Sequence, residues 1–463
     1  MNILVINVSL RPESKLKLFP VGLGYITTAM KIAGFEFDLI DIDAHRYSES
    51  QVEQLIRKKP YQIVCMGCIV SGYKIIKNIA AKVREIYPKT IIVVGNSVAS
   101  AVPEITLFKT AVDIAVIGEG DVTIVEVLKA VTAGRDLRDI AGICYRKDGE
   151  LVRTESRPYI KNLDTLPFID FSIWDTEIYI ENTPESAKDS LPFPRKDARC
   201  LPINTARGCI AHCTFCYHEF KAIPYRFRSP ESVVKEIVQL KKKYDLNLIG
   251  FSDELTFFSR KQSLALLDAF IEADLQVLWQ CNCRADLFQK RDEELFEKFR
   301  KAGCLGMTYS LESADSGILQ AMNKNISTVQ FARQTRLLQN SGFATFTSLV
   351  FGYPQETRET IRKTIDCCIE NNIYPSAGYL LPQPGSDMYD YAKDNGFITN
   401  EEDYLLSMGD RQDLLVNMTG MTNEEFEGYV RDGMRRCNEA LNIGLSEEQL
   451  IKTQYYRASS KSG

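Results

Sequence analysis

The sequence has no long uncharged apolar run and no excess of basic side chains. Its 463 residues include 56 Lys and Arg against 61 Asp and Glu, which gives a formal charge of −5. No apolar stretch approaches the roughly 20 residues that a membrane-spanning helix needs. The near balance of charge gives no global electrostatic reason to bind nucleic acid. We therefore expect no membrane span and no nucleic-acid partner.

The start of the chain lacks a basic segment followed by a small-residue cleavage site. Residues 1–7 enter an apolar strand pattern at once, so we expect no secretory signal peptide. Without such a signal, 13 cysteines are typical of a reducing compartment, where thiols stay free or bind metal, and we expect a cytoplasmic protein. The cysteines that lie in apolar periodic segments, as small core residues do, are Cys65, Cys68, Cys144, Cys304, Cys367, Cys368 and Cys437.

The sequence has few histidines and only one run of clustered cysteines. No second C-x2-C pair follows that run. Cys209, Cys213 and Cys216 have the spacing C-x3-C-x2-C. Structural zinc sites usually close with four ligands from paired knuckles, and His212 and His218 flank this run without a partner pair. Three thiolates on one loop suit a [4Fe-4S] cluster, which leaves one iron without a protein ligand and open to a substrate. A structural zinc site, or three thiols that merely share a loop, is the competing interpretation.

The first part of the chain alternates apolar strand patterns with amphipathic helical patterns. The strand patterns cover residues 3–7, 37–40, 63–67, 91–95 and 114–118. This alternation is typical of βαβ units, so we predict a doubly wound, Rossmann-like parallel sheet over residues 1–140, with ligands at the carboxyl ends of its strands. A hairpin turning at Asp148-Gly149 and a linker rich in Pro and charge are predicted over residues 141–200.

A second series of six strand patterns begins at Leu201, and the cysteine run follows its first strand. The later patterns cover residues 246–251, 276–283, 305–311, 343–351 and 377–381. Six βα units are too few for a closed eight-fold barrel, so we predict a six-stranded partial (β/α)6 barrel over residues 201–396, with its active site at the carboxyl ends of the strands. A small helical region is expected over residues 397–463, and its helix at 423–441 is expected to cap the barrel mouth.

The cysteine run resembles the cluster loop of the radical S-adenosylmethionine (SAM) superfamily, with an aromatic residue before the last cysteine and Tyr217 after it. The resemblance implies that the open iron chelates the amino and carboxylate groups of SAM. An electron from the cluster then cleaves the S–C5′ bond, giving methionine and a 5′-deoxyadenosyl radical that abstracts hydrogen. It also implies a reductant such as flavodoxin or ferredoxin. The cofactors carry the chemistry and the protein positions them.

Motifs at the strand ends extend this resemblance over about 200 residues. Segments 252–254, 283–286 and 310–313 lie where the superfamily contacts SAM, while segments 352–357 and 382–386 resemble the turns after its fifth and sixth strands. Each motif is weak by itself, because a lone carboxylate is more often a cap or an ion-pair partner. The residues that the resemblance implies as SAM contacts are Tyr217, Asp253, Glu254, Arg284 and Glu312.

The first domain resembles the cobalamin-binding domain that precedes the core in one large radical SAM class. The matching segments are 20–25, 95–100, 118–123 and 163–167. The residues expected to lie along a corrin are Cys68, Ser71, Gly95, Asn96, Ser97, Gly118, Glu119 and Gly120. No Asp-x-His-x-x-Gly motif follows the first strand, so we expect no histidine ligand to cobalt and interpret His45 as a loop residue. Asn96 and Ser97 replace the second glycine and the residue after it in the usual turn, and some proteins with this domain do not use cobalamin.

Three functions compete at this level. The leading hypothesis is a cobalamin-dependent radical SAM methyltransferase that acts on an unactivated carbon of a small molecule or natural product. The alternative is a radical SAM enzyme that performs rearrangement, elimination or C–C bond formation without using cobalamin. A non-catalytic cluster-binding or electron-transfer protein is the third. Cys281 and Cys283 lie two residues apart on one predicted strand and so face one side. They are either two small core residues or side chains of the barrel interior that quench a radical intermediate or bind a second cluster.

Overall fold

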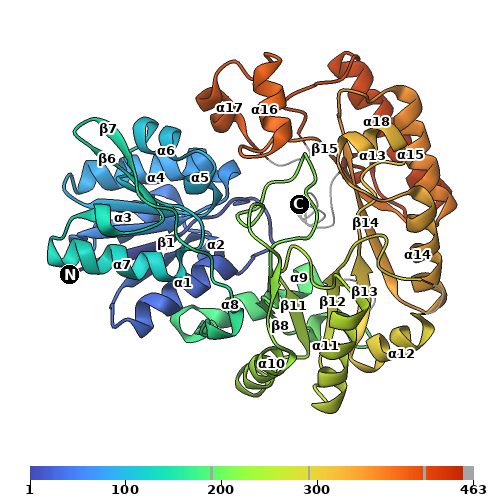
Figure 1. The fold of residues 1–463 in the computed structure, drawn as a ribbon, viewed down its shortest axis with the longest axis horizontal. Coiled ribbons are helices and arrows are strands. Elements are labelled where there is room, and N and C mark those ends of the chain that lie inside the picture. Colours follow the sequence, from blue (N-terminus) through green and yellow to red (C-terminus); the bar gives the residue numbers. More distant parts are fainter. Residues whose placement is uncertain (188–190, 290–291, 410–412, 452–463) are drawn as a thin grey trace.

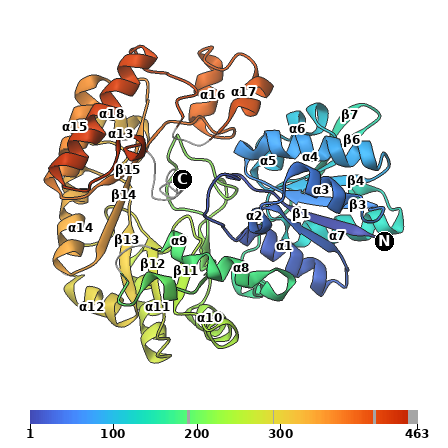
Figure 2. The same cartoon turned by 180° about the vertical axis from the view of Figure 1, so that it is seen from behind.

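The computed structural model of the protein describes residues 1–187, 191–289, 292–409 and 413–451. A seven-stranded sheet and a six-stranded sheet lie side by side, each with its own helices (Figure 1). Figure 2 shows α8 (Thr176–Glu181) and α9 (Thr183–Ser186) between the two halves. The predicted α/β class is confirmed, with a doubly wound sheet followed by a six-stranded parallel sheet. Within the described residues, no helix combines the length and apolarity needed to cross a membrane.

The first sheet has the strand order β2-β1-β3-β4-β5-β6-β7. Its strands are β1 (Ile3–Asn7), β2 (Asp38–Asp41), β3 (Ile63–Gly67), β4 (Ile91–Gly95), β5 (Ile114–Val116), β6 (Ile143–Lys147) and β7 (Glu150–Arg153). The first five are parallel. The chain winds to one side of β1 for β2 and to the other side for β3, so the switch point between β1 and β3 is where ligands bind in such sheets.

Helices cover both faces of this sheet, which is why its inner parallel strands β1, β3, β4 and β5 are almost entirely apolar rather than alternating. They are α1 (Val21–Ile32), α2 (Ile42–His45), α3 (Glu49–Ile56), α4 (Tyr73–Ile86), α5 (Ser97–Ser100), α6 (Pro103–Lys109) and α7 (Gly120–Ala133). Ile3 and Val5 of β1 share a buried cluster with residues of α1 and α7, whereas Leu4 and Ile6 share one with residues of α3 and α4. The carboxyl edge of the sheet therefore stays open between two helical layers.

The hairpin expected in the linker belongs instead to the first sheet. β6 pairs antiparallel with β5, and β7 pairs antiparallel with β6. Asp148 and Gly149 both have positive φ angles, 53° and 84°, as the predicted two-residue turn requires. Without the hairpin, β5 would present an unpaired edge, which a neighbouring chain could extend.

The second sheet is entirely parallel, in the order β15-β14-β13-β12-β11-β8. Its strands are β8 (Cys200–Ile203), β11 (Leu248–Phe251), β12 (Leu278–Asn282), β13 (Cys304–Thr308), β14 (Ala344–Phe351) and β15 (Pro375–Tyr379). The helices around it include α10 (Pro230–Tyr244), α11 (Arg260–Glu272), α12 (Glu293–Lys301), α14 (Thr328–Asn340) and α15 (Arg358–Glu370). These five lie on its outer side in Figure 1, and β8 and β15 form its two edges, so the predicted barrel is open.

The last long helix does not cap the barrel mouth. α18 (Asn423–Ala440) packs against α15 in the outer helical layer, and the Phe426 ring lies edge-on to Tyr379, 5.4 Å between ring centroids. The reason is its apolar stripe, because Phe426, Val430 and Met434 are buried and need an apolar partner surface. α16 (Asp387–Asp394) and α17 (Glu401–Ser407) lie nearer the first domain, and α17 contacts α4.

Cys281 and Cys283 face the outer helices rather than the barrel interior. Cys281 lies two residues after Trp279 on β12 and Cys283 follows the end of the strand, so the three side chains point to the same face, and all three are buried. The Trp279 ring packs against Phe270 of α11 and Phe299 of α12, which identifies that face of the strand. Both cysteines therefore belong to the apolar core.

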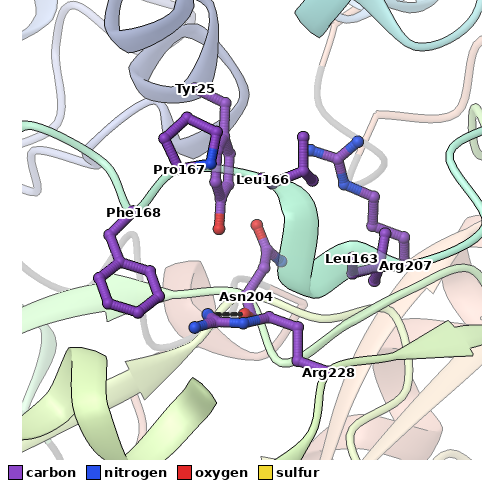
Figure 3. A pocket seen from close by; sticks show the side chains of 8 residues that line it. All are labelled: Tyr25, Leu163, Leu166, Pro167, Phe168, Asn204, Arg207 and Arg228. Atoms are coloured by element: carbon purple, nitrogen blue, oxygen red, sulfur yellow. Dashed lines mark hydrogen bonds between the residues drawn. The ribbon is translucent and has the colours of Figure 1, made fainter.

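The linker packs tightly between the two halves. An aromatic group of Phe19, Phe171, Trp174 and Tyr179 joins the loop after β1 to the linker. Figure 3 shows a second seam, where the Tyr25 side chain points from α1 toward Asn204. The space left there is about 10 Å³, roughly enough for one water molecule. Residues of the segment 163–167 line this space, so the segment that leads into the second sheet also closes the seam between the two halves.

Candidate functional site

The three clustered cysteines lie on one loop, residues 208–225, which we call the cluster loop. A short antiparallel ribbon of β9 (Ala206–Arg207) and β10 (Arg226–Phe227) closes its base. Cys213 is buried, while Cys209 and Cys216 are half-buried. Burial raises the pKa of the Cys213 thiol, and burial together with the charges of Cys213 and Cys209 raises the pKa of the Cys216 thiol to about 12. Within the described residues, no three His, Cys, Asp or Glu side chains converge on a point that a single metal ion could occupy.

The middle of the cluster loop is bound to the barrel through Thr214. Its backbone N–H donates to the carbonyl of Met322 at 3.0 Å, and its Oγ1 donates to the carbonyl of Ala321 at 2.8 Å. The Met388 N–H in turn donates to the Thr214 carbonyl at 3.1 Å. The segment between Cys213 and Cys216 is thus held from two sides by backbone hydrogen bonds.

The end of the cysteine run is positioned by a glycine. Gly385, in the turn after β15, has a φ of +86°, and a Cβ atom there would lie 2.4 Å from the Tyr217 ring. Only glycine leaves room for this ring. The resemblance noted for segment 382–386 therefore has a packing reason, since this turn supports the side chain directly after Cys216.

Two acidic residues at the end of β11 have different surroundings. Glu254 lines the large cavity described below, and its Oε2 accepts a hydrogen bond from the Gly208 N–H at 3.1 Å. Asp253 is buried and faces the turn after β8 instead. Its carboxylate accepts from the backbone N–H groups of Thr205 and Ala206, from the Thr205 hydroxyl and from the Asn204 amide. With these four donors, Asp253 holds the turn before the cluster loop, and its contact with SAM stays a prediction.

A charged group lies beside the cluster loop inside the barrel. Glu312 is buried and forms an ion pair with Lys324, with 2.9 Å between Oε1 and Nζ. Burial lowers the pKa of Lys324, but the charges of Glu312 and Cys213 and the hydrogen bond to Glu312 together outweigh it, so the net shift of the pKa is upward. Arg284 pairs with Asp286 and donates to the carbonyls of Lys324 and Asn325. Lys324 Nζ lies 5.9 Å from the centre of the Phe215 ring, which places this group next to the cluster loop.

Sequence reasoning missed Lys324. Its flanking residues Asn323 and Asn325 have φ angles of 50° and 52°, which asparagine tolerates better than most residues. The Asn-Lys-Asn pattern after a helix was the available signal for a tight turn that points a cation inward. His218 was also missed as a site residue. It lines the large cavity, its Nδ1 is buried without a hydrogen-bond partner among the described residues, and burial lowers its pKa to about 4.

A cavity of about 770 Å³ lies between the carboxyl edge of the first sheet and the cluster loop. All eight residues expected along a corrin line it. Its floor includes Asn7, Gly67 and Gly95, which are register partners at the ends of β1, β3 and β4. A Cβ atom added at Gly67 or Gly95 would meet nothing closer than 3.9 Å, so a flat ring system can approach the backbone there. This floor fits a corrin, and the contacts of the eight residues with one stay a prediction.

Asn96 and Ser97 preserve the turn after β4 despite replacing the usual residues. Asn96 has φ 69° and ψ −168°, a backbone conformation that is almost confined to glycine, and its side chain accepts from the Ser97 N–H. The Ser97 hydroxyl accepts from the Val70 N–H at 2.8 Å, which joins the turns after β3 and β4. His45 lies elsewhere, stacked on Tyr47 and paired with Asp175 at 2.8 Å.

The chain matches known proteins over both halves. The radical SAM superfamily model matches residues 203–368, and the B12 binding domain model matches residues 10–128. The anaerobic magnesium-protoporphyrin IX monomethyl ester cyclase of Rubrivivax gelatinosus is 30% identical over 396 residues, covering 83% of this chain and 68% of the cyclase. An uncharacterized methyltransferase of Pyrococcus horikoshii is 25% identical over 419 residues, covering 89% of this chain and 86% of that protein.

Two solved structures share the fold. TsrM from Kitasatospora setae, with cobalamin and a [4Fe-4S] cluster bound, has a TM-score of 0.67 at 18% identity and covers 86% of this chain and 78% of its own. OxsB, with aqua-cobalamin and SAM bound, has a TM-score of 0.65 at 16% identity and covers 98% of this chain and 63% of its own. The chain therefore belongs to the radical SAM superfamily of enzymes, and it carries a B12 binding domain in front of its radical SAM domain.

Proposed function

We propose that this enzyme uses a [4Fe-4S] cluster, SAM and cobalamin to methylate an unactivated carbon of a small molecule. The observation that carries the proposal is the single cavity of about 770 Å³. It has the strand-end floor of the B12 binding domain on one side and Tyr217 and Glu254 of the barrel on the other. A substrate in this space could reach both cofactors. The solved structures of TsrM and OxsB, in which cobalamin is bound together with a cluster or with SAM, support this assignment.

The residues divide the work between the two domains. Cys209, Cys213 and Cys216 would hold three irons of the cluster, and the thiolate donor set suits that group. Glu254 and Glu312 would bind SAM, and the glycine floor would support the corrin. When bound, the cluster would supply an electron that cleaves the S–C5′ bond of SAM, and the cobalamin would supply a carrier that takes the methyl group from the second SAM as a nucleophile and gives it to the substrate radical.

The net reaction balances with two SAM molecules and two electrons from a low-potential reductant such as flavodoxin or ferredoxin. One SAM gives methionine and, with the hydrogen taken from the substrate, 5′-deoxyadenosine. The other loses its methyl group through heterolysis of the S–CH3 bond and leaves as S-adenosylhomocysteine. The methyl group replaces the hydrogen on the substrate carbon. The enzyme would do this in the cytoplasm, where such reductants are present.

A second candidate is C–C bond formation without methyl transfer. It is favoured by the likeness to the anaerobic cyclase of Rubrivivax gelatinosus, which is 30% identical to this chain. In that case the 5′-deoxyadenosyl radical would still abstract hydrogen, but no S-adenosylhomocysteine would form.

One anaerobic experiment separates the candidates. The full chain is reconstituted with iron, sulfide and hydroxocobalamin, then given SAM and titanium(III) citrate. Methylation predicts bound cobalamin and formation of both 5′-deoxyadenosine and S-adenosylhomocysteine, the latter only when cobalamin is present. Formation of 5′-deoxyadenosine alone would overturn methylation in favour of the second candidate. Absence of both products, with an intact cluster, would instead indicate an electron-transfer protein.

A further inference from the structure

Both ends of the cluster loop are bound to one turn of the B12 binding domain. That turn, residues 118–121, follows β5 and lines the cavity; we call it the β5 turn. Arg207 of β9 and Arg226 of β10, which are register partners at the base of the cluster loop, both reach Glu119 of the β5 turn. The base of the cluster loop is therefore joined to the other domain by two arginines and one carboxylate.

The contacts of this ion group are short, although Nε and Nη2 of Arg226 are buried without a hydrogen-bond partner in the described part of the chain. Arg207 Nη1 lies 2.6 Å from Glu119 Oε1, and Arg207 Nη2 lies 3.0 Å from Asp121 Oδ1. Arg226 Nη1 lies 2.9 Å from Glu119 Oε2, which also accepts from the Ile160 N–H at 2.7 Å. The Glu119 side chain is only 3% exposed, and those of Arg207 and Arg226 are 10% and 5% exposed. Both oxygens of the Glu119 carboxylate are therefore occupied by the two arginines and the Ile160 N–H.

A separate contact holds the other side of the cluster loop. Glu219, three residues after Cys216, accepts through Oε1 a hydrogen bond from the Gly118 N–H at 3.1 Å. Gly118 directly precedes Glu119, so the same turn receives both contacts. The Phe220 ring lies 5.8 Å from the Arg207 guanidinium and 5.4 Å from that of Arg226, and it fills the space between the two contacts.

We propose that Glu119, Arg207, Arg226 and Glu219 form an interdomain clamp that sets the position of the cluster loop relative to the corrin floor, and that they are positioning residues for methyl transfer. The inference rests on the proposed function. SAM and the cluster would both be held by the barrel, whereas the corrin would be held by the other domain. S–C5′ cleavage then depends on one domain, but any step between SAM and cobalamin depends on how the two domains are placed.

Methyl transfer is the step most sensitive to this placement. A displacement reaction requires the reacting atoms to lie roughly 3–3.5 Å apart and in line, and a misplacement of about 1 Å can reduce the rate on the order of a hundredfold. Loss of the clamp should therefore slow S-adenosylhomocysteine formation far more than 5′-deoxyadenosine formation. General damage to the fold would instead reduce both.

The chain offers a matched control. Lys77 of α4 and Glu402 of α17 form another ion pair between the first domain and the C-terminal region, reinforced by the Tyr73 hydroxyl. Neither Lys77 nor Glu402 lines the cavity. Lys77→Met therefore removes an interdomain ion pair without touching the β5 turn or the cluster loop.

The test compares wild type, Glu119→Gln, Glu219→Leu and Lys77→Met as full-length protein loaded with cluster and hydroxocobalamin. Hydrogen exchange of peptides that contain the β5 turn and the cluster loop gives a readout besides activity. We expect faster exchange in both peptides for Glu119→Gln and Glu219→Leu, and no change for Lys77→Met. Bound cobalamin is measured by its absorbance in each variant, and rates are taken per bound cobalamin, because Glu119 also lines the cavity. With SAM and reductant, we expect the two clamp variants to lose about tenfold or more of S-adenosylhomocysteine formation per bound cobalamin, with 5′-deoxyadenosine within about twofold of wild type.

The outcomes distinguish the clamp from the function on which it rests. Equal losses of both products in Glu119→Gln and Glu219→Leu, or the same selective loss in Lys77→Met, would overturn the clamp. Should Glu119→Gln not fold, Glu219→Leu decides by itself, since it removes one hydrogen-bond acceptor and leaves the ion group intact. A wild-type enzyme that makes no S-adenosylhomocysteine with cobalamin would overturn the proposed function, and the positioning role with it.

Discussion

Two non-glycine residues of the site, Glu312 and Asn96, have positive backbone φ angles, which lower the stability of the fold. Glu312 has a φ of 65° although it is not glycine, and it is buried beside Lys324. Asn96 holds a glycine-like conformation at the cavity floor. Such conformations cost on the order of 1–3 kcal/mol each and gather at binding sites, because the surrounding structure maintains them there. Both residues belong to the set that the sequence pattern indicated.

Cys213→Ala should abolish the cluster. A cubane held by two protein thiolates is labile, so iron content, the broad brown absorbance and SAM cleavage should all be lost. The matched control is Cys283→Ala, because that thiol is equally buried but lies against the outer helices. Iron content at the wild-type level in Cys213→Ala would exclude the cluster assignment.

Glu312→Ala should keep the cluster and weaken SAM binding. A charge-assisted hydrogen bond from the ligand to this carboxylate contributes about 1.5–3 kcal/mol, which corresponds to roughly a tenfold to hundredfold change in Kd. Calorimetric titration of SAM into the reconstituted variant measures it. Lys324→Met is the companion variant, since it removes the partner of the same buried pair. If SAM affinity is unchanged in Glu312→Ala, the carboxylate serves only that ion pair.

Glycines at the ends of strands and turns shape the site. Gly67 and Gly95 end neighbouring strands in register, which flattens the cavity floor. Gly385 ends the turn that supports Tyr217. In each case the element brings backbone, rather than side chain, to the place where a ring packs.

Gly95→Val should block cobalamin uptake while leaving SAM cleavage intact. The added side chain starts in open space, with its nearest neighbour, Val116, at 3.9 Å, so the sheet accepts it but the floor no longer admits a flat ring. Absorbance of bound cobalamin after gel filtration measures uptake, and 5′-deoxyadenosine measures cleavage. Uptake equal to that of wild type would place the corrin elsewhere.

Gly385→Ala should loosen the end of the cysteine run. Its Cβ would lie 2.4 Å from the Tyr217 ring, so the cluster loop has to shift, and we expect lower iron occupancy and slower SAM cleavage. Gly396→Ala is the control, because Gly396 also has a positive φ, 74°, but no atom within 4 Å of an added Cβ. Similar losses in both variants would attribute the effect to backbone strain alone.

At the scale of the whole molecule, two domains meet around one cavity, and their relative position is set by buried contacts. The linker closes the Tyr25 seam, the aromatic group around Phe19 packs the loop after β1, and the clamp joins the β5 turn to the cluster loop. Together with the Lys77–Glu402 ion pair, these contacts join the halves into a unit in which a ligand of one domain affects the other.

Cobalamin should therefore stabilise more than its own domain. A ligand present at about 100 times its Kd adds about 2.7 kcal/mol to the stability of the state that binds it. We expect hydroxocobalamin to raise the melting temperature of both domains of the wild-type protein, measured by calorimetry. In Glu119→Gln the shift should be confined to the first domain. A shift confined to that domain in wild type would mean that the two halves unfold independently.

The sequence by itself determined the two α/β halves, the Asp148-Gly149 turn and the cysteine loop. Each of these depends on hydrophobic periodicity or residue spacing within a short segment of the chain. The sequence also indicated the strand ends at which the site residues gather, since parallel strands bring their carboxyl ends to one edge. Only the tertiary structure decided where the side chains of Asp253 and Glu119 point, that the hairpin completes the first sheet, that Cys281 and Cys283 face the helices and that α18 lies outside the barrel. These choices depend on partners far apart in the chain, such as Arg207 for Glu119 and α15 for α18, and no local pattern specifies which distant surface a carboxylate or an apolar stripe will find.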